Sequence, residues 1–235
     1  MSGQPFSHHP VMADETVRLL EPERGGQFLD ATVGGGGHAE RILASSPAAT
    51  LIGLDQDPEA VAAARKRLSV FGERARLVTG NFRDAAELIG GYIDVGLDGA
   101  LLDLGVSSHQ IDTTARGFSF RRGTPLNMRM GGTTGGWRTA ADLLNTASEE
   151  ELGKIFRDYG EERKWRAMSR EITRRRRQRP LRNADDLVAA ASAALRRPLA
   201  QRDKARLFQA VRIAVNEELE SLREGLDAIA QLLAT

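Results

Sequence analysis

The stretch DATVGGGGH, residues 30–38, places four consecutive glycines between an apolar run and a segment with the composition of a helix. Glycine inside a regular element costs about 1 kcal/mol relative to alanine, so four in a row predict an irregular turn. A glycine turn between a strand and a helix lets the backbone approach a ligand closely, and the helix start offers free N–H groups. We therefore interpret residues 34–37 as a nucleotide-binding loop rather than a floppy turn, with His38 placed to contact the ligand.

Strand-like and helix-like segments alternate around this loop as far as about residue 104. Helices are expected at 38–45, from Pro58 onward with Asp57 as the N-cap, and at 83–90. Alternating strands and helices imply a parallel sheet with right-handed crossovers, which is the α/β class. The expected strands are GQFLDATV (26–33), ATLIGLD (49–55), ARLVTG (75–80) and DGALLDLG (98–105).

The pattern changes after residue 105. Residues 105–138 are rich in Gly, Ser, Thr and Arg and show no periodicity, which predicts a long functional loop or a linker. Everything from 139 onward has helical periodicity. N-caps are expected at Thr139, Ser148 and Asn183, and a helix end at Gly160. From about residue 203 the pattern predicts one long helix, or two with a break near Asn216.

Composition limits the function classes. The chain has 235 residues, 41% of them hydrophobic, which suits one medium domain or one domain with an insert. With no cysteine, disulfides and cysteine metal sites are excluded, and the four histidines show no metal-ligand spacing, so we expect no metal. No signal pattern or membrane-length apolar run is present, so the expectation is a soluble cytoplasmic protein without membrane contact.

Charge is distributed unevenly along the chain. The net charge is +1, yet residues 161–182 hold ten Lys/Arg and three Glu, leaving −6 for the rest. A basic run is usually a solvated helix face, but this excess over acidic residues favours a polyanion such as RNA.

Polar side chains at the ends of the other expected strands narrow the ligand. Asp55 ends the second strand, where a carboxylate can accept both ribose hydroxyls; this suits an NAD-dependent oxidoreductase and an S-adenosylmethionine (SAM) methyltransferase alike. The dinucleotide spacing G-x-G-x-x-G fails because its last position is Ala39. Phe82 follows the third strand, where an adenine could stack on it, although it could also be a core residue. Asp103 ends the fourth strand, although it could also be a helix cap. Open α/β sheets bind ligands at their carboxyl edge, so the set together favours a SAM site.

Nearly the whole chain resembles the bacterial 16S ribosomal RNA cytosine-N4 methyltransferase family, called RsmH or MraW. The most specific stretches are LLDLGVSS followed by RGFSF and MRM, and the similarity also runs through HHPVMADETVRLL, DATVGGGGHAERIL, GLDQDPEA, GNF, YGEERKW and RLFQAVRIAVNEELE. The resemblance implies a Rossmann-like class I SAM methyltransferase sheet of order 3-2-1-4 with an inserted helical subdomain. It implies SAM as the cofactor, 16S ribosomal RNA or the small ribosomal subunit as the partner, and SAM contacts from Gly36, Gly37, His38, Asp55, Phe82, Asp103 and Gln110.

Departures from the family pattern accompany the similarity. His109 stands where the family usually has proline, and Asn127 stands where it usually has aspartate. The family also continues beyond the last helix into further strands that these 235 residues lack, so the expected sheet is truncated. We therefore expect GALLDL to lie at a sheet edge that needs a cover, with low stability or a homodimer and weaker methyl transfer as consequences.

The expected segments are a SAM-binding α/β domain at 1–105, a helical insert for substrate recognition at 106–205, and a C-terminal helix at 206–235 that returns to the α/β domain. Asp103 is the expected catalytic residue, either accepting a proton from the cytosine amine or holding only the methionine amine of SAM. Two other functions stay open: a non-catalytic RNA-binding or assembly protein, which would turn over no SAM, and an oxidoreductase, which would bind NAD and not SAM.

Overall fold

A computed structural model describes residues 10–132 and 138–234. The chain divides into two compact units, which we call the sheet unit (residues 1–109 and 219–235) and the helical unit (residues 110–218). His8 and His9 of the N-terminal motif, and residues 133–137 of the glycine-rich segment, lie outside the described residues. The boundary between the insert and the returning helix falls at residues 218 and 219, later than the residue 206 predicted from periodicity.

The sheet unit is built on four parallel strands in the order β3-β2-β1-β4, as predicted. The first and last expected strands are shorter than their apolar runs. The first strand ends at Asp30, where the chain turns into the glycine loop, and the last strand ends at Leu101, the residue paired with Asp30. The strands are β1 Gly26–Asp30, β2 Ala49–Asp55, β3 Ala75–Thr79 and β4 Gly99–Leu101.

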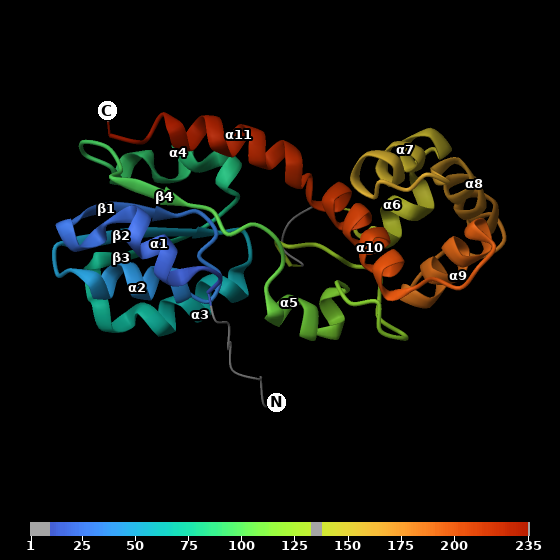
Figure 1. Ribbon diagram of the computed structural model, residues 1–235, viewed down its shortest axis with the longest axis horizontal. Coiled ribbons are helices and arrows are strands. Elements are labelled where there is room, and N and C mark those ends of the chain that lie inside the picture. Colours follow the sequence, from blue (N-terminus) through green and yellow to red (C-terminus); the bar gives the residue numbers. More distant parts are fainter. Residues whose placement is uncertain (1–9, 133–137, 235) are drawn as a thin grey trace. The chain divides into compact units, whose positions relative to one another are not determined.

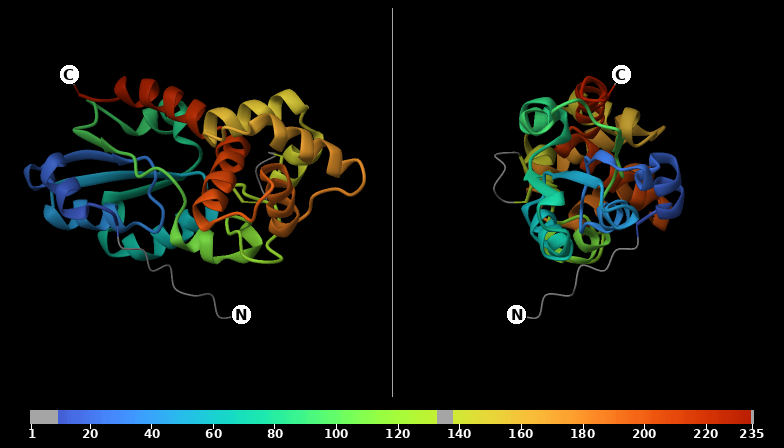
Figure 2. Two further views of the ribbon diagram at one scale, coloured as in Figure 1. Left: turned by 45° about the vertical axis from the view of Figure 1, so that its right-hand side comes forward. Right: turned by 90° about the vertical axis from the view of Figure 1, so that its left-hand side faces the viewer.

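Helices cover both faces of this sheet, as a parallel sheet requires (Figure 1). Phe28 and Leu51 point into a core formed with α2 and α3, whereas the alternate residues Leu29 and Ile52 point into a second core closed by α4 and by Ile229 of α11. Figure 2 shows the same layers from a second direction. The helices are α1 Ala13–Leu20, α2 Gly37–Ser45, α3 Pro58–Leu68, α4 Ala85–Ile89 and α11 Glu218–Ala230.

Local sequence signals set the ends of these helices. The Asp57 side chain accepts the backbone N–H of Glu59 at 3.1 Å, and Pro58 occupies the first turn of α3, as expected. Glu217 adopts a left-handed conformation with φ of 49° and separates α10 from α11, so of the two predicted alternatives the structure has two helices with a break near Asn216.

Strand β4 forms one edge of the sheet, as predicted for GALLDL. Just before it, Leu97 pairs in parallel with the segment after α11: its N–H donates to the Leu232 carbonyl at 2.8 Å, and its carbonyl accepts the Ala234 N–H at 2.9 Å. Residues 232–234 and α11 therefore cover part of this edge.

The helical unit is held together by capped helices and one polar clamp. Thr139 and Asn183 each form a capping box with the residue three positions later, and Ser148 caps α7. The Asn216 amide donates to the Met128 carbonyl at 2.7 Å and accepts the Met130 N–H at 2.8 Å. The boundary to the sheet unit falls within α5 Ser108–Asp112, and a π-helical turn at Ile155–Tyr159 continues α7. The other helices of this unit are α6 Ala140–Thr146, α7 Glu149–Lys154, α8 Trp165–Arg176, α9 Ala184–Leu195 and α10 Gln201–Asn216.

No helix in the described part of the chain is long and apolar enough to cross a membrane. Over the same residues, no group of three or more His, Asp or Glu side chains is arranged to hold a metal ion.

Candidate cofactor site at the carboxyl edge of the sheet

The glycine loop turns sharply between β1 and α2. Gly34 and Gly36 both have positive φ, 50° and 81°, and Gly36 is the N-cap of α2. A Cβ on Gly36 would lie 3.4 Å from both Ala64 Cα and Leu68 Cγ of α3, so this position has a packing reason to be glycine as well. A Cβ on Gly34 would meet only the Thr32 carbonyl oxygen at 3.8 Å, which leaves this part of the loop open to a ligand.

Asp55, the last residue of β2, fastens this loop to the sheet. Its Oδ2 accepts the Gly34 N–H at 2.9 Å, and its Oδ1 accepts the Asp57 N–H at 2.9 Å. A carboxylate that accepts two backbone N–H groups is fixed in orientation. The ribose contact remains a prediction, and the structure adds a second role for Asp55 as the anchor of the glycine loop.

Asp103 and His38 meet at the same edge of the sheet. His38 is 7% exposed, and its Nε2 lies 3.6 Å from Asp103 Oδ2. The Asp103 N–H donates to the Thr32 hydroxyl at 2.6 Å, which ties the segment after β4 to the segment after β1. The other ring nitrogen of His38, Nδ1, is buried and has no hydrogen-bond partner among the described residues.

Asp30, the last residue of β1, brings a third carboxyl group to this edge. It is 1% exposed, and its Oδ1 accepts the Thr32 N–H at 3.2 Å. Burial raises the pKa of Asp30 to about 7, with the charges of Asp55 and Asp103 adding to the rise, while the Thr32 N–H and His38 oppose it.

These residues fit a cationic nucleoside cofactor. Three carboxyl groups converge with one histidine, an arrangement that attracts positive charge. The orphaned His38 Nδ1 is the kind of buried polar atom that a ligand satisfies, because leaving it unpaired costs about 1–3 kcal/mol. SAM offers both a positive sulfonium and groups that can pair with a ring nitrogen.

Comparison with known proteins agrees with this geometry. The family model described as the MraW methylase family matches residues 5–235. The chain belongs to the MraW methylase family. A protein named ribosomal RNA small subunit methyltransferase H from Geobacter sp. (strain M21) is 47% identical over 234 residues, covering 97% of this chain and 74% of that protein. Proteins of the same name from Syntrophotalea carbinolica and Heliobacterium modesticaldum are 47% and 45% identical over 237 and 236 residues.

Two further residues that the family pattern assigns to SAM have surroundings of their own. Phe82 is partly buried against the core beneath α11, where a Cβ on Gly225 would overlap its ring, so the alternative reading of Phe82 as a packing residue also has support. Gln110 is 7% exposed and belongs to the helical unit. Both stay predictions as SAM contacts.

The two substitutions relative to the MraW methylase pattern have their own partners. His109 Nε2 lies 3.6 Å from Glu59 Oε2, a contact that proline could not make. Asn127 Oδ1 accepts the Arg129 Nε–H at 2.9 Å, so a neutral amide here suffices to orient that guanidinium.

Two residues of the site escaped the sequence analysis. Asp30 was visible only as the end of an apolar run, although a carboxylate directly before a glycine loop is itself a signal. Thr32 lies between Asp30 and the loop, and its role depends on a hydrogen bond to a residue 71 positions later, which no local pattern reveals.

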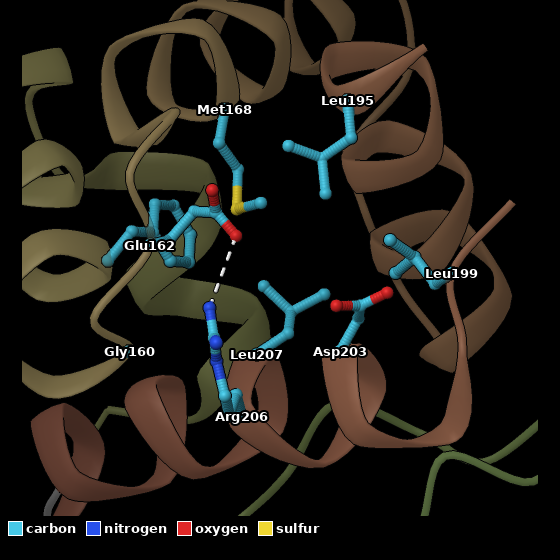
Figure 3. A pocket seen from close by; sticks show the side chains of 9 residues that line it. Gly160, Glu162, Met168, Leu195, Leu199, Asp203, Arg206 and Leu207 are labelled. Atoms are coloured by element: carbon cyan, nitrogen blue, oxygen red, sulfur yellow. Dashed lines mark hydrogen bonds and ion pairs between the residues drawn. The ribbon is translucent and has the colours of Figure 1, made fainter. Parts of the chain in front are cut away.

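The helical unit contains a cavity of about 10 Å³, room for about one water molecule (Figure 3). Arg206 reaches into it, with its guanidinium 3.5 Å from Glu162 Oε2 and its buried Nε without a partner among the described residues. The small volume and mostly apolar wall mark an internal packing defect rather than a cofactor site. The lining residues are Phe156, Gly160, Glu162, Met168, Leu195, Leu199, Asp203, Arg206 and Leu207.

Proposed function

We propose that this chain transfers the methyl group of SAM to N4 of a cytidine in 16S ribosomal RNA of the small subunit. The observation that carries the proposal is the cluster at the carboxyl edge of the sheet: a glycine loop, three carboxyl groups and a buried histidine, one of whose nitrogens has no partner within residues 10–132 and 138–234. The family relationship and the names of the relatives support the choice of substrate. Ribosomal RNA as the substrate places the proposed activity in the cytoplasm.

Asp103 has the main catalytic role in this proposal. The exocyclic amine of cytosine is a weak nucleophile, because its lone pair is delocalised into the ring. When bound, SAM supplies the methyl group on a sulfonium. The amine loses one proton as its new bond to carbon forms, and we assign the Asp103 carboxylate as the acceptor. The hydrogen bond from the Asp103 N–H to Thr32 holds the backbone at this position, and orientation of this kind supplies much of the rate enhancement.

The basic run of residues 161–182 fits the RNA part of the proposal. A base must leave its stack to reach a methyl donor, so the target is a single-stranded or loop nucleotide. In this proposal the sheet unit binds SAM, the helical unit recognises RNA, and residues 219–235 return to the sheet. A second copy of the chain is our proposed cover for the uncovered part of the β4 edge, and sedimentation of the purified chain measures it.

Four arginines of residues 161–182 differ in whether they have an acidic partner. Arg174 and Arg175 both bind Glu171, at 2.8 Å and 2.6 Å, and are therefore partly neutralised. Arg177 and Arg179 are exposed and make no ion pair with any described residue, so these charges are available to phosphates. Within the basic run of residues 161–182, Arg177 and Arg179 are therefore better candidates for phosphate contacts than Arg174 and Arg175.

The catalytic assignment is tested with Asp103→Asn, which keeps the side-chain shape and removes the proton acceptor. Methyl transfer from labelled SAM to 16S RNA should fall by about 10²–10⁴-fold, with N4-methylcytidine as the product by mass spectrometry. Asp227→Asn, at an exposed carboxylate of α11, is the matched control and should retain activity. SAM binding by the unmodified chain without any turnover would instead favour the non-catalytic RNA-binding alternative.

The RNA face is tested with two double variants that remove equal charge. Arg177→Gln with Arg179→Gln should weaken RNA binding and lower the slope of log affinity against log salt by about 1.4, the value for two contacts to single-stranded RNA. Arg174→Gln with Arg175→Gln should change the slope less, because Glu171 already balances part of their charge. Equal slopes for the two variants would exclude this division of roles.

A further inference from the structure

Asp30 is a buried carboxyl group that the proposed methyl transfer does not use. It lies at the end of β1, 1% exposed, and its Oδ1 accepts a hydrogen bond from the Thr32 N–H. An isolated ionised carboxylate in such a place is strongly disfavoured unless a positive charge balances it. The group is therefore poised to respond to the charge of whatever occupies the site.

The charged groups that act on Asp30 come from three neighbouring elements. Asp55 at the end of β2 and Asp103 after β4 disfavour its ionised form, and His38 at the start of α2 favours it. A single histidine thus faces three carboxyl groups, and it also lies 3.6 Å from Asp103. Among these described groups His38 alone favours the Asp30 anion, and a cationic ligand at this edge would act in the same direction.

We propose that Asp30 makes the site selective for the charge of its cofactor: it gives up its proton when SAM binds and retains more of it when the demethylated product S-adenosylhomocysteine (SAH) binds. This inference rests on the proposed function, since it takes SAM as the ligand of the glycine loop. Asp30 acts through its charge and need not touch the cofactor.

The charges of the two ligands give the reason. Both carry an ammonium group and a carboxylate, but SAM adds a sulfonium and has a net charge of +1, whereas SAH is neutral overall. In an interior of low effective dielectric constant, a charge several ångströms away shifts a carboxyl pKa substantially. SAM therefore stabilises the Asp30 anion more than SAH does, and the site holds the substrate form of the cofactor more tightly than the spent form.

The direction of the pH dependence follows from the raised pKa of about 7. Below pH 7 Asp30 holds its proton in the free protein, so SAM binding must first displace it, and SAM affinity should rise with pH. A group that titrates at 7 and is ionised in the complex predicts about fivefold tighter SAM binding at pH 7 than at pH 6. This range avoids most of the titration of the ligand's own α-amino group, near 7.7–8.0.

The test is isothermal titration calorimetry of the whole chain with SAM and with SAH, each in two buffers of different ionisation enthalpy. The difference between buffers gives the number of protons released. At pH 7 we expect about half a proton released by SAM from Asp30, and fewer by SAH. In Asp30→Asn the difference between the two ligands should disappear, because the amide still accepts the Thr32 N–H but does not titrate.

Asp30→Asn removes a buried ionisable group and keeps its shape, and circular dichroism checks that it folds. If it does not fold, ¹³C NMR of the Asp30 carboxyl in the unmodified chain decides: SAM should lower its titration midpoint and SAH should lower it less. Equal proton release by the two ligands, an unmoved Asp30 midpoint, or a ligand difference that survives in folded Asp30→Asn overturns the inference while leaving the cofactor assignment intact. Failure of the unmodified chain to bind SAM overturns both.

Discussion

Replacing Gly36 by alanine tests whether the glycine loop needs its backbone conformation. Gly36 has φ of 81°, a left-handed conformation that costs an L-residue about 1–2 kcal/mol. The new methyl group would also lie 3.4 Å from Ala64 Cα and Leu68 Cγ, so α3 has to yield slightly. We expect a loss of about 1–2 kcal/mol in the free energy of unfolding, which corresponds to a melting temperature lower by about 2–8 °C.

Gly90→Ala is the matched control for this variant. Gly90 has φ of −56°, and a Cβ there would meet no atom of the residues that the structure describes within 4 Å. The same substitution should therefore leave stability unchanged or raise it by about 0.4–1 kcal/mol, through lower entropy of the unfolded chain. Melting is followed by circular dichroism, and SAM binding by calorimetry. A Gly36→Ala protein that melts at or above the temperature of the unmodified chain would refute the reasoning, because neither strain nor crowding would then exist at this turn.

Three further substitutions test single interactions. Asn216→Ala should lower the free energy of unfolding by about 1–3 kcal/mol in urea titrations, because it removes the side-chain hydrogen bonds to the Met128 carbonyl and from the Met130 N–H. Thr32→Val should lower methyl transfer about tenfold by removing the acceptor of the Asp103 N–H, and Thr32→Ser should restore it; equal losses would point to packing instead. Hydrogen bonds from Arg174 and Arg175 lower the pKa of Glu171 from 4.5 to about 2, so the ionised side chain stabilises the fold above pH 4.5 and this contribution is lost as the pH falls toward 2. Glu171→Gln should therefore be less stable than the unmodified chain at pH 7, and the difference in melting temperature between the two should close in acid.

Local signals predicted a large part of this fold. The Asp57–Pro58 helix start, the capping boxes at Thr139 and Asn183, and the break near Asn216 each depend on residues within a few positions of one another. The strand order followed from the alternation of strands and helices together with the family resemblance. Such features are readable because one short segment determines them.

What the sequence could not show depends on distant partners. The burial of Asp30 needs the ends of several strands to meet, and the division of the arginines into paired and unpaired groups needs the position of Glu171 on α8. Gly36 was assigned to the ligand, yet its contact with α3 gives it a packing role that only the folded chain reveals. The pairing of Leu97 with residues 232–234 is likewise invisible until α11 has been placed.

The position of α11 has a consequence for how the chain folds as it is made. One face of the sheet is closed by Ile229, and Leu97 finds its backbone partners only at residues 232–234. The ribosome synthesises the entire helical unit, residues 110–218, before it reaches α11. During translation the helical unit can fold first, while Leu29, Ile52 and Leu54 of the sheet are not yet covered by α11. We therefore expect the nascent sheet unit to bind chaperones that recognise exposed apolar strands, and a slow codon within α11 to prolong that exposure.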